Sequence, residues 1–309
     1  MRIRTSTMAM QDQSVSAMLA QQVRIANTQE QLATGLKVVR PSDNPAAAVR
    51  SLILDESVEL KDQYQVNIGM ARGRLAQEDV VLGGVVDVMQ RLHELGVRAL
   101  NGSLNAKDRQ SMESETRELL NEISSLSNTK TSTGEYLFAG LNSKTVAFTG
   151  SPVTGGYVYG GDSGRRSTAI GEGYTINDND PGDAVFTVAA PAVPVGFPPA
   201  APENIMNLVF QFAEHLAANQ PDSSDLANLQ LSLEQVSARR TSVGARLVAL
   251  DQQEELNAKL TTDEKALLSK TRDLDYTEAI SRLNLETTAL EAAQQAYSKV
   301  QKLSLFNYL

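Results

Sequence analysis

Apolar residues recur at spacings of three, four and seven along most of this chain, which is the pattern of helices with one apolar face. Residues 8–36 follow a heptad in which Gln11, Gln22 and Gln29 share the stripe with apolar positions. Residues 280–306 carry a similar stripe. We expect these two arms to be helices that need partners. Their apolar positions, the assembly seam, are Met8, Val15, Met18, Ile25 and Leu32 in the first arm, and Ile280, Leu283, Leu290, Tyr297, Val300, Leu303 and Phe306 in the second.

The region between the arms predicts an antiparallel helical bundle. One long helix is expected from Pro45 to about Leu100, with a bend or a close helix contact at its glycines, and Asn105 can cap the next helix. A later helix is expected from Leu226 onward, with an apolar frame broken only by Arg240. The stripes are Ile68, Leu75, Leu82 and Met89; Met112, Thr116, Leu119, Ile123 and Leu126; and Leu229, Leu233, Val236, Val243, Leu247 and Leu250, continuing through Leu256 and Leu260.

Residues 141–202 have a different composition. They hold half of the 20 glycines and seven of the 10 prolines, with short β-type runs at 156–159 and 184–188. The sequence therefore predicts a mainly α protein with a small inserted β domain. The expected domains are an inner assembly domain of paired terminal helices (1–44 and 270–309), a helical bundle (45–140 and 203–269) and an outward-facing insertion (141–202).

A short elbow separates the first arm from the bundle. Gly35 is placed to end the first helix in a left-handed conformation. Each residue before a proline is pushed away from the helical conformation, and Asn44 followed by Pro45 is a strong helix start. The predicted interdomain elbow comprises Gly35, Arg40, Pro41, Ser42, Asp43, Asn44 and Pro45.

Composition removes several classes of function. The chain has no Cys, which excludes disulfides, thiolate catalysis and Cys-type zinc sites. Its net charge of −9, without Lys/Arg-rich runs, argues against nucleic-acid binding. The apolar stretches are too short to cross a membrane, and residues 8–13 are too polar for the core of a signal peptide. We expect no cofactor.

The candidates for chemistry have simpler explanations. Gly161–Gly164 resembles the nucleophile segment of serine proteases, but Arg165 interrupts the motif and a β-turn explains the residue types. Residues 178–183 could hold calcium, although they lack the glycine and the glutamate of an EF-hand loop. His93 and His215 are isolated and form no ligand set, so no metal site is expected.

Five segments carry a resemblance to a known family. They are Met1–Ile3, Gln31–Val38, Pro41–Ala48, Gly134–Gly140, and Asp273–Ile280 together with Leu303–Leu309. In this order they are similar to the flagellin superfamily, and within it to the hook–filament junction family. The elbow prolines, the glycine-bounded run and the Phe-Asn-Tyr-Leu ending favour the junction family. Flagellin, the filament-forming subunit, is the alternative.

The resemblance implies a flagellin-like fold and a structural, non-enzymatic adaptor of the bacterial flagellum. The implied partners are further copies of the chain in a helical array, the first hook-associated protein, flagellin, and a cytoplasmic export chaperone on the C-terminal arm. The implied location is extracellular, reached by type III export without a cleaved signal peptide. A hydrolase that uses Ser163 is the alternative from another class.

Overall fold

The computed structural model describes residues 7–192 and 202–302, and its contacts divide the chain into two compact units. Unit 1 contains residues 1–60 and 259–309, and unit 2 contains residues 61–258. The helices are α1 (Thr7–Thr34), α2 (Pro45–Ala99), α3 (Ala106–Ser127), α4 (Gly182–Phe186), α5 (Ile205–Ala217), α6 (Ser223–Arg272) and α7 (Tyr276–Lys302). Both α2 and α6 contribute residues to each unit. The predicted mainly α class with a small β portion is confirmed.

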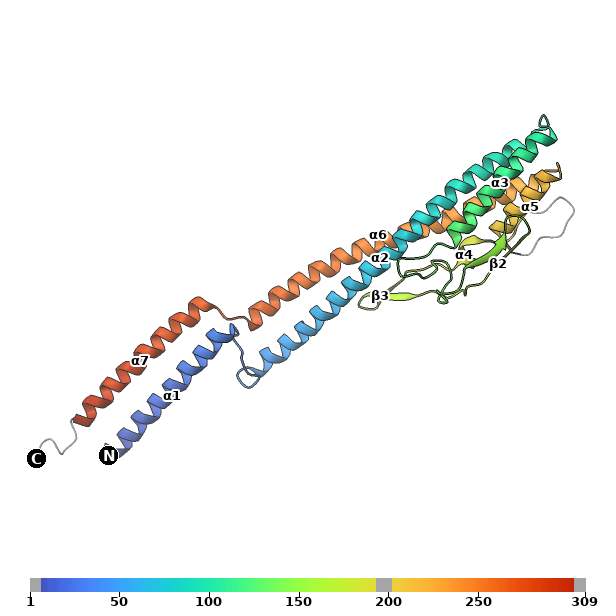
Figure 1. Cartoon of the computed structure of the whole chain (residues 1–309). Coiled ribbons are helices and arrows are strands. Elements are labelled where there is room, and N and C mark those ends of the chain that lie inside the picture. Colours follow the sequence, from blue (N-terminus) through green and yellow to red (C-terminus); the bar gives the residue numbers. More distant parts are fainter. Residues whose placement is uncertain (1–6, 193–201, 303–309) are drawn as a thin grey trace, which may run out of the picture. The chain divides into compact units, whose positions relative to one another are not determined.

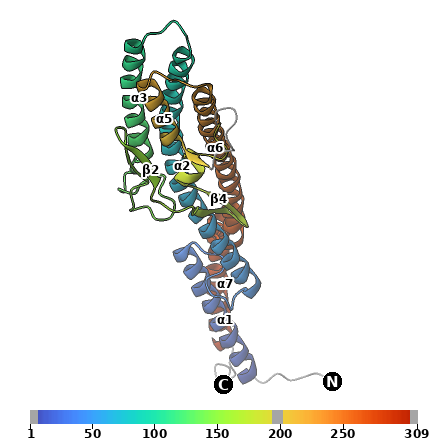
Figure 2. The same cartoon turned by 90° about the vertical axis from the view of Figure 1, so that its right-hand side faces the viewer.

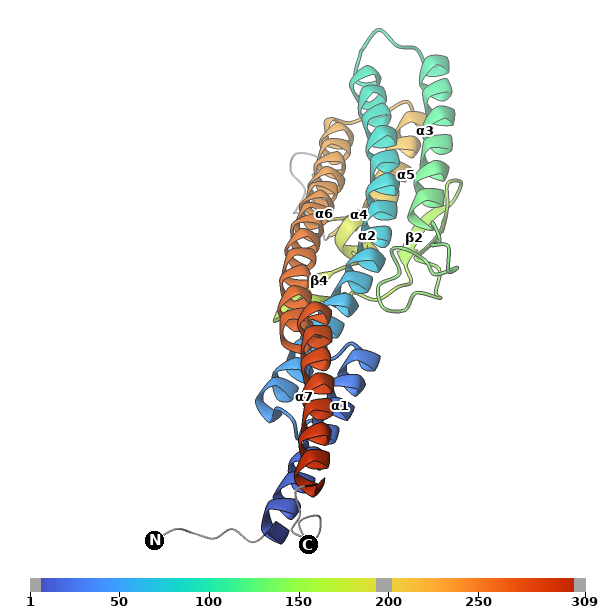
Figure 3. The ribbon, with the colours of Figure 1, turned by 90° about the vertical axis from the view of Figure 1, so that its left-hand side faces the viewer.

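Unit 1 is built from two helix pairings. Helices α1 and α7 lie side by side and run in opposite directions (Figures 1 and 3). The first residues of α2 face the last residues of α6, where Val58 and Leu268 are buried. The Ser57 hydroxyl lies 3.1 Å from the Glu264 carboxylate at the same place. The unit therefore combines the two arms with one end of the long helices.

The helices of unit 2 follow the predicted stripes closely. All four heptad residues of α2, Ile68 to Met89, are fully buried. The cap predicted at Asn105 is present and is part of a capping box, because the Asn105 side chain accepts from the Asp108 backbone N–H and the Asp108 carboxylate accepts from the Asn105 N–H. Helices α3 and α5 lie side by side (Figure 2). The apolar face of each helix thus points into one shared core.

Glycines of α2 allow close packing in unit 2. A Cβ on Gly83 would lie 3.4 Å from the Arg240 guanidinium, and one on Gly84 would lie 3.3 Å from Leu126. The close helix contact expected at this glycine pair is confirmed. By contrast, a Cβ on Gly69 or Gly73 would meet nothing within 4 Å, so these two glycines serve no close contact within the described residues.

The predicted stripe of α6 fails towards its C-terminal half. Leu256 and Leu260 are exposed, while the neighbouring Asn257 and Thr261 are buried. The side-chain amide of Asn257 donates to the Ile170 carbonyl at 2.8 Å. Asn257 takes a buried position because it binds the backbone of the insertion, a partner that helical periodicity alone does not reveal.

Among the described residues, the insertion forms α4 and three antiparallel strand pairs, and the second strand of the last pair lies just beyond residue 202. Strand β1 (Phe148–Ser151) pairs with β2 (Gly155–Tyr159), β3 (Ser167–Gly171) pairs with β4 (Tyr174–Asn177), and β5 (Thr187–Val188) pairs with β6 (Glu203–Asn204). Phe148, Tyr157 and Ile170 belong to the same buried cluster as the helices of unit 2. The insertion therefore shares the core of the bundle in this unit.

The run Gly134–Gly140 joins α3 to the insertion. The Phe138 ring is fully buried and meets the Phe186 ring edge to face, with 5.1 Å between centroids. The Phe138 carbonyl accepts from the Gly182 N–H and from the Tyr159 hydroxyl. Gly140 has a φ of +72°, and a Cβ there would lie 2.1 Å from the Asp162 carbonyl oxygen. Only glycine fits this close approach of two backbones.

Candidate functional site

Polar groups form the centre of the contact between α1 and α7. The Gln21 side chain donates to the Glu286 carbonyl at 2.9 Å, and the Thr28 hydroxyl donates to the Glu286 carboxylate at 2.9 Å. The Arg282 guanidinium donates to the Gln31 side-chain oxygen at 2.8 Å. Gln21 and Thr28 are buried and stand seven residues apart, as two turns of one helix face require. The arms therefore meet through a partly polar interface.

The apolar residues of the assembly seam are only partly covered in the single chain. Half-buried side chains are Met18, Ile25, Leu32, Leu283, Leu290 and Tyr297. Val15 and Ile280 are exposed. The side chains of Met8 and Val300 lie outside the described structure, as do residues Leu303 and Phe306 altogether. The seam stays a prediction of what an assembly covers.

The structure corrects the register of the glutamines in α1. Gln22 and Gln29 are exposed, whereas Gln21 and Thr28, one position earlier, are buried; Gln11 lies outside the described side chains. Positions 18, 25 and 32 fit both the heptad frame with Gln22 and Gln29 and the frame with Gln21 and Thr28. Periodicity in α1 alone therefore does not distinguish the two frames. The choice comes from α7, whose Glu286 supplies acceptors to Gln21 and Thr28.

A second apolar stripe on α1 was missed by the sequence analysis. Leu19 is 57% exposed and Val23 is 59% exposed, and with Val15 they stand four residues apart on one helix face. In α7, Leu285 is 73% exposed. The spacing of 15, 19 and 23 could have revealed this stripe, but the heptad frame assigned only one apolar face to the helix. The arms thus present more apolar surface than their mutual contact covers.

The elbow begins at a short backbone bridge between residues 35–37 and residues 272–274. Gly35 has a φ of +71°, which confirms its predicted left-handed conformation. Its carbonyl accepts from the Leu274 N–H at 2.9 Å, and the Lys37 N–H donates to the Arg272 carbonyl at 2.7 Å. A Cβ on Gly35 would lie 2.8 Å from the Tyr276 hydroxyl. The bridge ties the end of α1 to the turn between α6 and α7.

The rest of the elbow is an exposed turn with its own hydrogen bonds. The Asp43 carboxylate accepts from the Arg40 N–H at 3.0 Å, and the Arg40 guanidinium pairs with Glu30 at 3.0 Å. The Asn44 side chain accepts from the Ala47 N–H at 3.0 Å, which confirms the predicted cap of α2. A depression of about 480 Å³ lies beside the turn, lined by both acidic and basic side chains, among them Asp43, Lys37, Lys270, Asp275 and Arg282. A mixed lining of this kind favours no single class of ligand charge.

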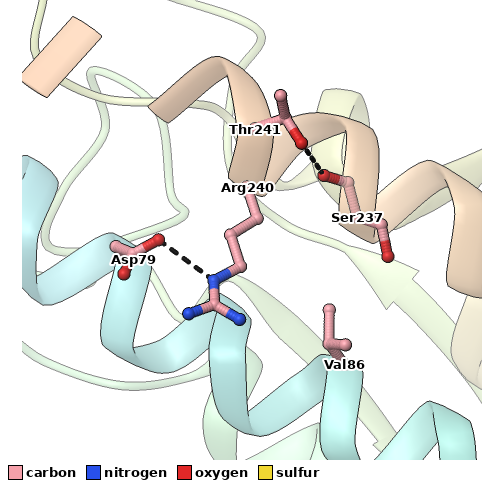
Figure 4. A pocket seen from close by; sticks show the side chains of 5 residues that line it. All are labelled: Asp79, Val86, Ser237, Arg240 and Thr241. Atoms are coloured by element: carbon pink, nitrogen blue, oxygen red, sulfur yellow. Dashed lines mark hydrogen bonds and ion pairs between the residues drawn. The ribbon is translucent and has the colours of Figure 1, made fainter. Parts of the chain in front are cut away.

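A second depression, of about 360 Å³, lies between α2 and α6 of unit 2 (Figure 4). The Arg240 guanidinium donates to the Asp79 carboxylate at 3.1 Å, and Ser237, Thr241 and Val86 line the rest. Arg240 is the residue that breaks the predicted frame of α6. It extends over Gly83 to Asp79, so the polar residue reaches solvent beside the core. Its charge is already balanced by Asp79.

The candidate nucleophile lies in an exposed loop. The Ser163 hydroxyl binds the Asp183 carboxylate, and the Asp162 carboxylate accepts from the Leu141 and Gly164 N–H groups at 2.8 Å each. Those backbone donors hold the pKa of Asp162 below its ordinary value. Among the hydrogen bonds of the described residues, His215 pairs with Asp225 and neither histidine contacts Ser163. The Ser–His pair of a serine protease is therefore not formed among the described residues.

In the acidic segment 178–183, Asp178 and Asp180 form ion pairs with arginines. Asp178 pairs with Arg74 at 3.1 Å and with Arg166 at 2.9 Å. Asp180 pairs with Arg246. Within residues 7–192 and 202–302, no group of three or more His, Asp or Glu residues is arranged to hold a metal ion. In the same part of the chain, no helix combines the length and the apolar character that crossing a membrane requires.

Comparisons with known proteins agree with the architecture. The family profile described as the bacterial flagellin N-terminal helical region matches residues 5–143. Flagellar hook-associated protein 3 of Escherichia coli (strain K12) is 29% identical over 319 residues, which covers 98% of this chain and 99% of the relative. Flagellin FlaB2 of Treponema pallidum is 22% identical over 284 residues, covering 89% of this chain and 90% of the relative.

A solved structure shows the same fold. The crystal structure of flagellar hook-associated protein 3 from Legionella pneumophila has a TM-score of 0.63 and 22% identity, and covers 71% of this chain and 98% of its own. The sequence similarity extends over both arms and the helices between them, while the structure supports the fold. The chain is therefore similar to the flagellin superfamily, and flagellar hook-associated protein 3 is a relative that matches it over 98% of its length.

Proposed function

We propose that this chain is a structural adaptor of the bacterial flagellum, which joins the hook to the flagellin filament. The observation that carries the proposal is the similarity to flagellar hook-associated protein 3 over 98% of this chain and 99% of the relative. A match at both ends matters because both arms leave apolar side chains uncovered in the single chain. The lower identity to flagellin FlaB2 makes the filament subunit the weaker reading.

The adaptor acts by binding its neighbours. Copies of the chain would associate in a short helical array through the arms, with the first hook-associated protein on one side and flagellin on the other. Support comes from the exposed apolar stripe Val15, Leu19 and Val23 on α1 and from Leu285 on α7. Burying such stripes against a neighbouring helix is a favourable route to assembly. The polar contacts of Gln21 and Thr28 would hold the two arms of one subunit in register.

Export would bring the chain to the outside of the cell. Its relatives are flagellar proteins, and we propose that it leaves through the flagellar type III exporter without a cleaved signal peptide. A cytoplasmic chaperone on the C-terminal arm would cover the apolar positions of α7 before assembly. The half-buried Leu283 and Leu290 and the exposed Leu285 are the described residues that such a chaperone would shield.

Electron microscopy of a complemented strain tests the function. A strain that lacks its hook–filament junction protein is expected to regain filaments on its hooks when it expresses this chain. Long filaments made of this chain itself would instead identify a filament subunit. Bare hooks, despite normal amounts of the chain in the medium, would contradict both functions. A variant that carries Ser163→Ala is the matched control, because a structural adaptor does not need this hydroxyl.

A further inference from the structure

Glu78 is a carboxylic acid on the apolar face of α2. It stands between Leu75 and Leu82, at the helical spacing that places all three side chains on one face. The residue is only 1% exposed. Neither carboxyl oxygen receives a hydrogen bond from any of the described residues. A buried carboxylate without donors is very unfavourable, so the ionisation state of Glu78 needs an explanation.

The groups that face Glu78 come from the insertion and from α6. They are the Asp180 carboxylate and the guanidinium groups of Arg246 and Arg165. Asp180 already binds Arg246 and lies 3.6 Å from Arg165. Arg246 also donates to the Asn177 carbonyl at 2.9 Å. Both guanidinium groups are therefore ion-pair partners of Asp180.

A second ion-pair group near this site uses two further arginines. The almost fully buried carboxylate of Asp178 forms ion pairs with Arg74 of α2 and with Arg166 of the insertion. Arg74 stands four residues before Glu78 on the same helix, yet it bonds Asp178. The arrangement leaves Glu78 facing another acceptor. Two carboxylates cannot bond each other unless one of them carries a proton.

We propose that Glu78 is a neutral carboxylic acid that donates its proton in a hydrogen bond to Asp180, and that this bond makes the attachment of the insertion to α2 proton-dependent. Burial and the neighbouring charge of Asp180 raise the pKa of Glu78 to about 9, although Arg246 and Arg165 act in the opposite direction. The pair is a switch between a bonded state with one shared proton and a state with two buried like charges.

The sign of the pH dependence follows from this raised pKa. Between the ordinary pKa of 4.5 and the raised value of about 9, the folded chain holds one proton more than the unfolded chain. The contribution is fully present below pH 4.5 and is lost as the pH rises towards 9. In this window the unfolding equilibrium constant should increase by up to about tenfold per pH unit. The lowered pKa values of Asp162 and Asp222 act below pH 4 and leave this window unaffected.

Carbon-13 NMR of the Glu side-chain carboxyl groups in the intact chain tests the proton directly. One Glu resonance should titrate several pH units above the others, and it should be missing from the spectrum of Glu78→Gln. In Asp180→Asn the same resonance should titrate at lower pH, because the like charge is gone and the new amide can donate. If every Glu resonance of the parent chain titrates below pH 6, the proposal is overturned, and this result does not depend on any variant folding.

Chemical unfolding measured from pH 5 to pH 9 tests the consequence. Glu78→Gln keeps the shape and a donor for Asp180 but cannot titrate, so its unfolding constant should lose the part of the pH dependence that one proton contributes. The matched control is Asp79→Asn, which neutralises the next residue on α2 at the partly exposed ion pair with Arg240. This control should keep the pH dependence of the parent. Equal pH dependence of Glu78→Gln and the parent would contradict the proton-linked attachment.

Discussion

Replacing Leu285 by Asp should separate contacts within one subunit from contacts between subunits. Leu285 is 73% exposed in α7, whereas Leu290, five residues later, is half-buried. Leu285→Asp therefore changes little in the single chain. In an assembly that buries the residue, the variant loses most of the ~2 kcal/mol that covering a leucine contributes, and it must also desolvate a carboxylate.

The expected loss is large enough to measure. A loss of ~1.4 to 3 kcal/mol per contact corresponds to roughly ten- to more than a hundredfold weaker binding at each subunit. The effect would repeat at every equivalent contact in the array. Leu290→Asp and Tyr297→Asp should also prevent incorporation, and they should in addition weaken the contact of α7 with α1. Unit 2 should stay folded in all three variants, because none of these residues belongs to it.

The assay combines motility with two controls. Swimming and the number of filaments per cell report incorporation, and the amount of the chain in the medium reports export, which a chaperone contact on the same arm could affect. Thermal unfolding of the purified variants reports the fold of unit 2. If the Leu285→Asp strain is exported, swims normally and keeps its filaments, this face of α7 is not an assembly surface and the reasoning is refuted.

Three further predictions concern the elbow and the serine loop. Replacing Pro41 and Pro45 by Ala should leave export and melting temperature nearly unchanged but increase filament shedding under shear, because the restricted turn no longer sets the angle at the elbow. If the double variant holds its filaments as firmly as the parent, the elbow is a passive linker. Gly35→Ala should destabilise the bridge by ~1 kcal/mol or more, owing to the positive φ and the nearby Tyr276 hydroxyl. Faster amide exchange at residues 35–38 should reveal this loss of stability. Unchanged exchange would argue against backbone strain in the variant. Ser163→Ala should alter neither motility nor any hydrolytic activity of the purified chain, and a specific loss of esterase or peptidase activity would support the hydrolase alternative.

The sequence by itself determined the features that depend on neighbours along the chain. The heptad Ile68 to Met89 predicted a buried face of α2, and all four residues are fully buried. Asn44 and Asn105 cap the helices that follow them, and Gly35 adopts the left-handed conformation. These outcomes follow from helical periodicity and from the hydrogen bonds that helix ends require, both of which are local. The role of the assembly seam and of the elbow in assembly remains a prediction.

Only the tertiary structure decided which polar residues are buried. Gln21 and Thr28 replace the expected Gln22 and Gln29 because Glu286 approaches α1 from α7, more than 250 residues away in sequence. Asn257 is buried because it reaches the Ile170 carbonyl of the insertion. The spacing of Glu78 from Leu75 and Leu82 puts it on the apolar face of α2, but only the fold brings Asp180 to it in the core. A buried polar group depends on its partner, and the partner of each of these residues comes from a distant segment that periodicity does not identify.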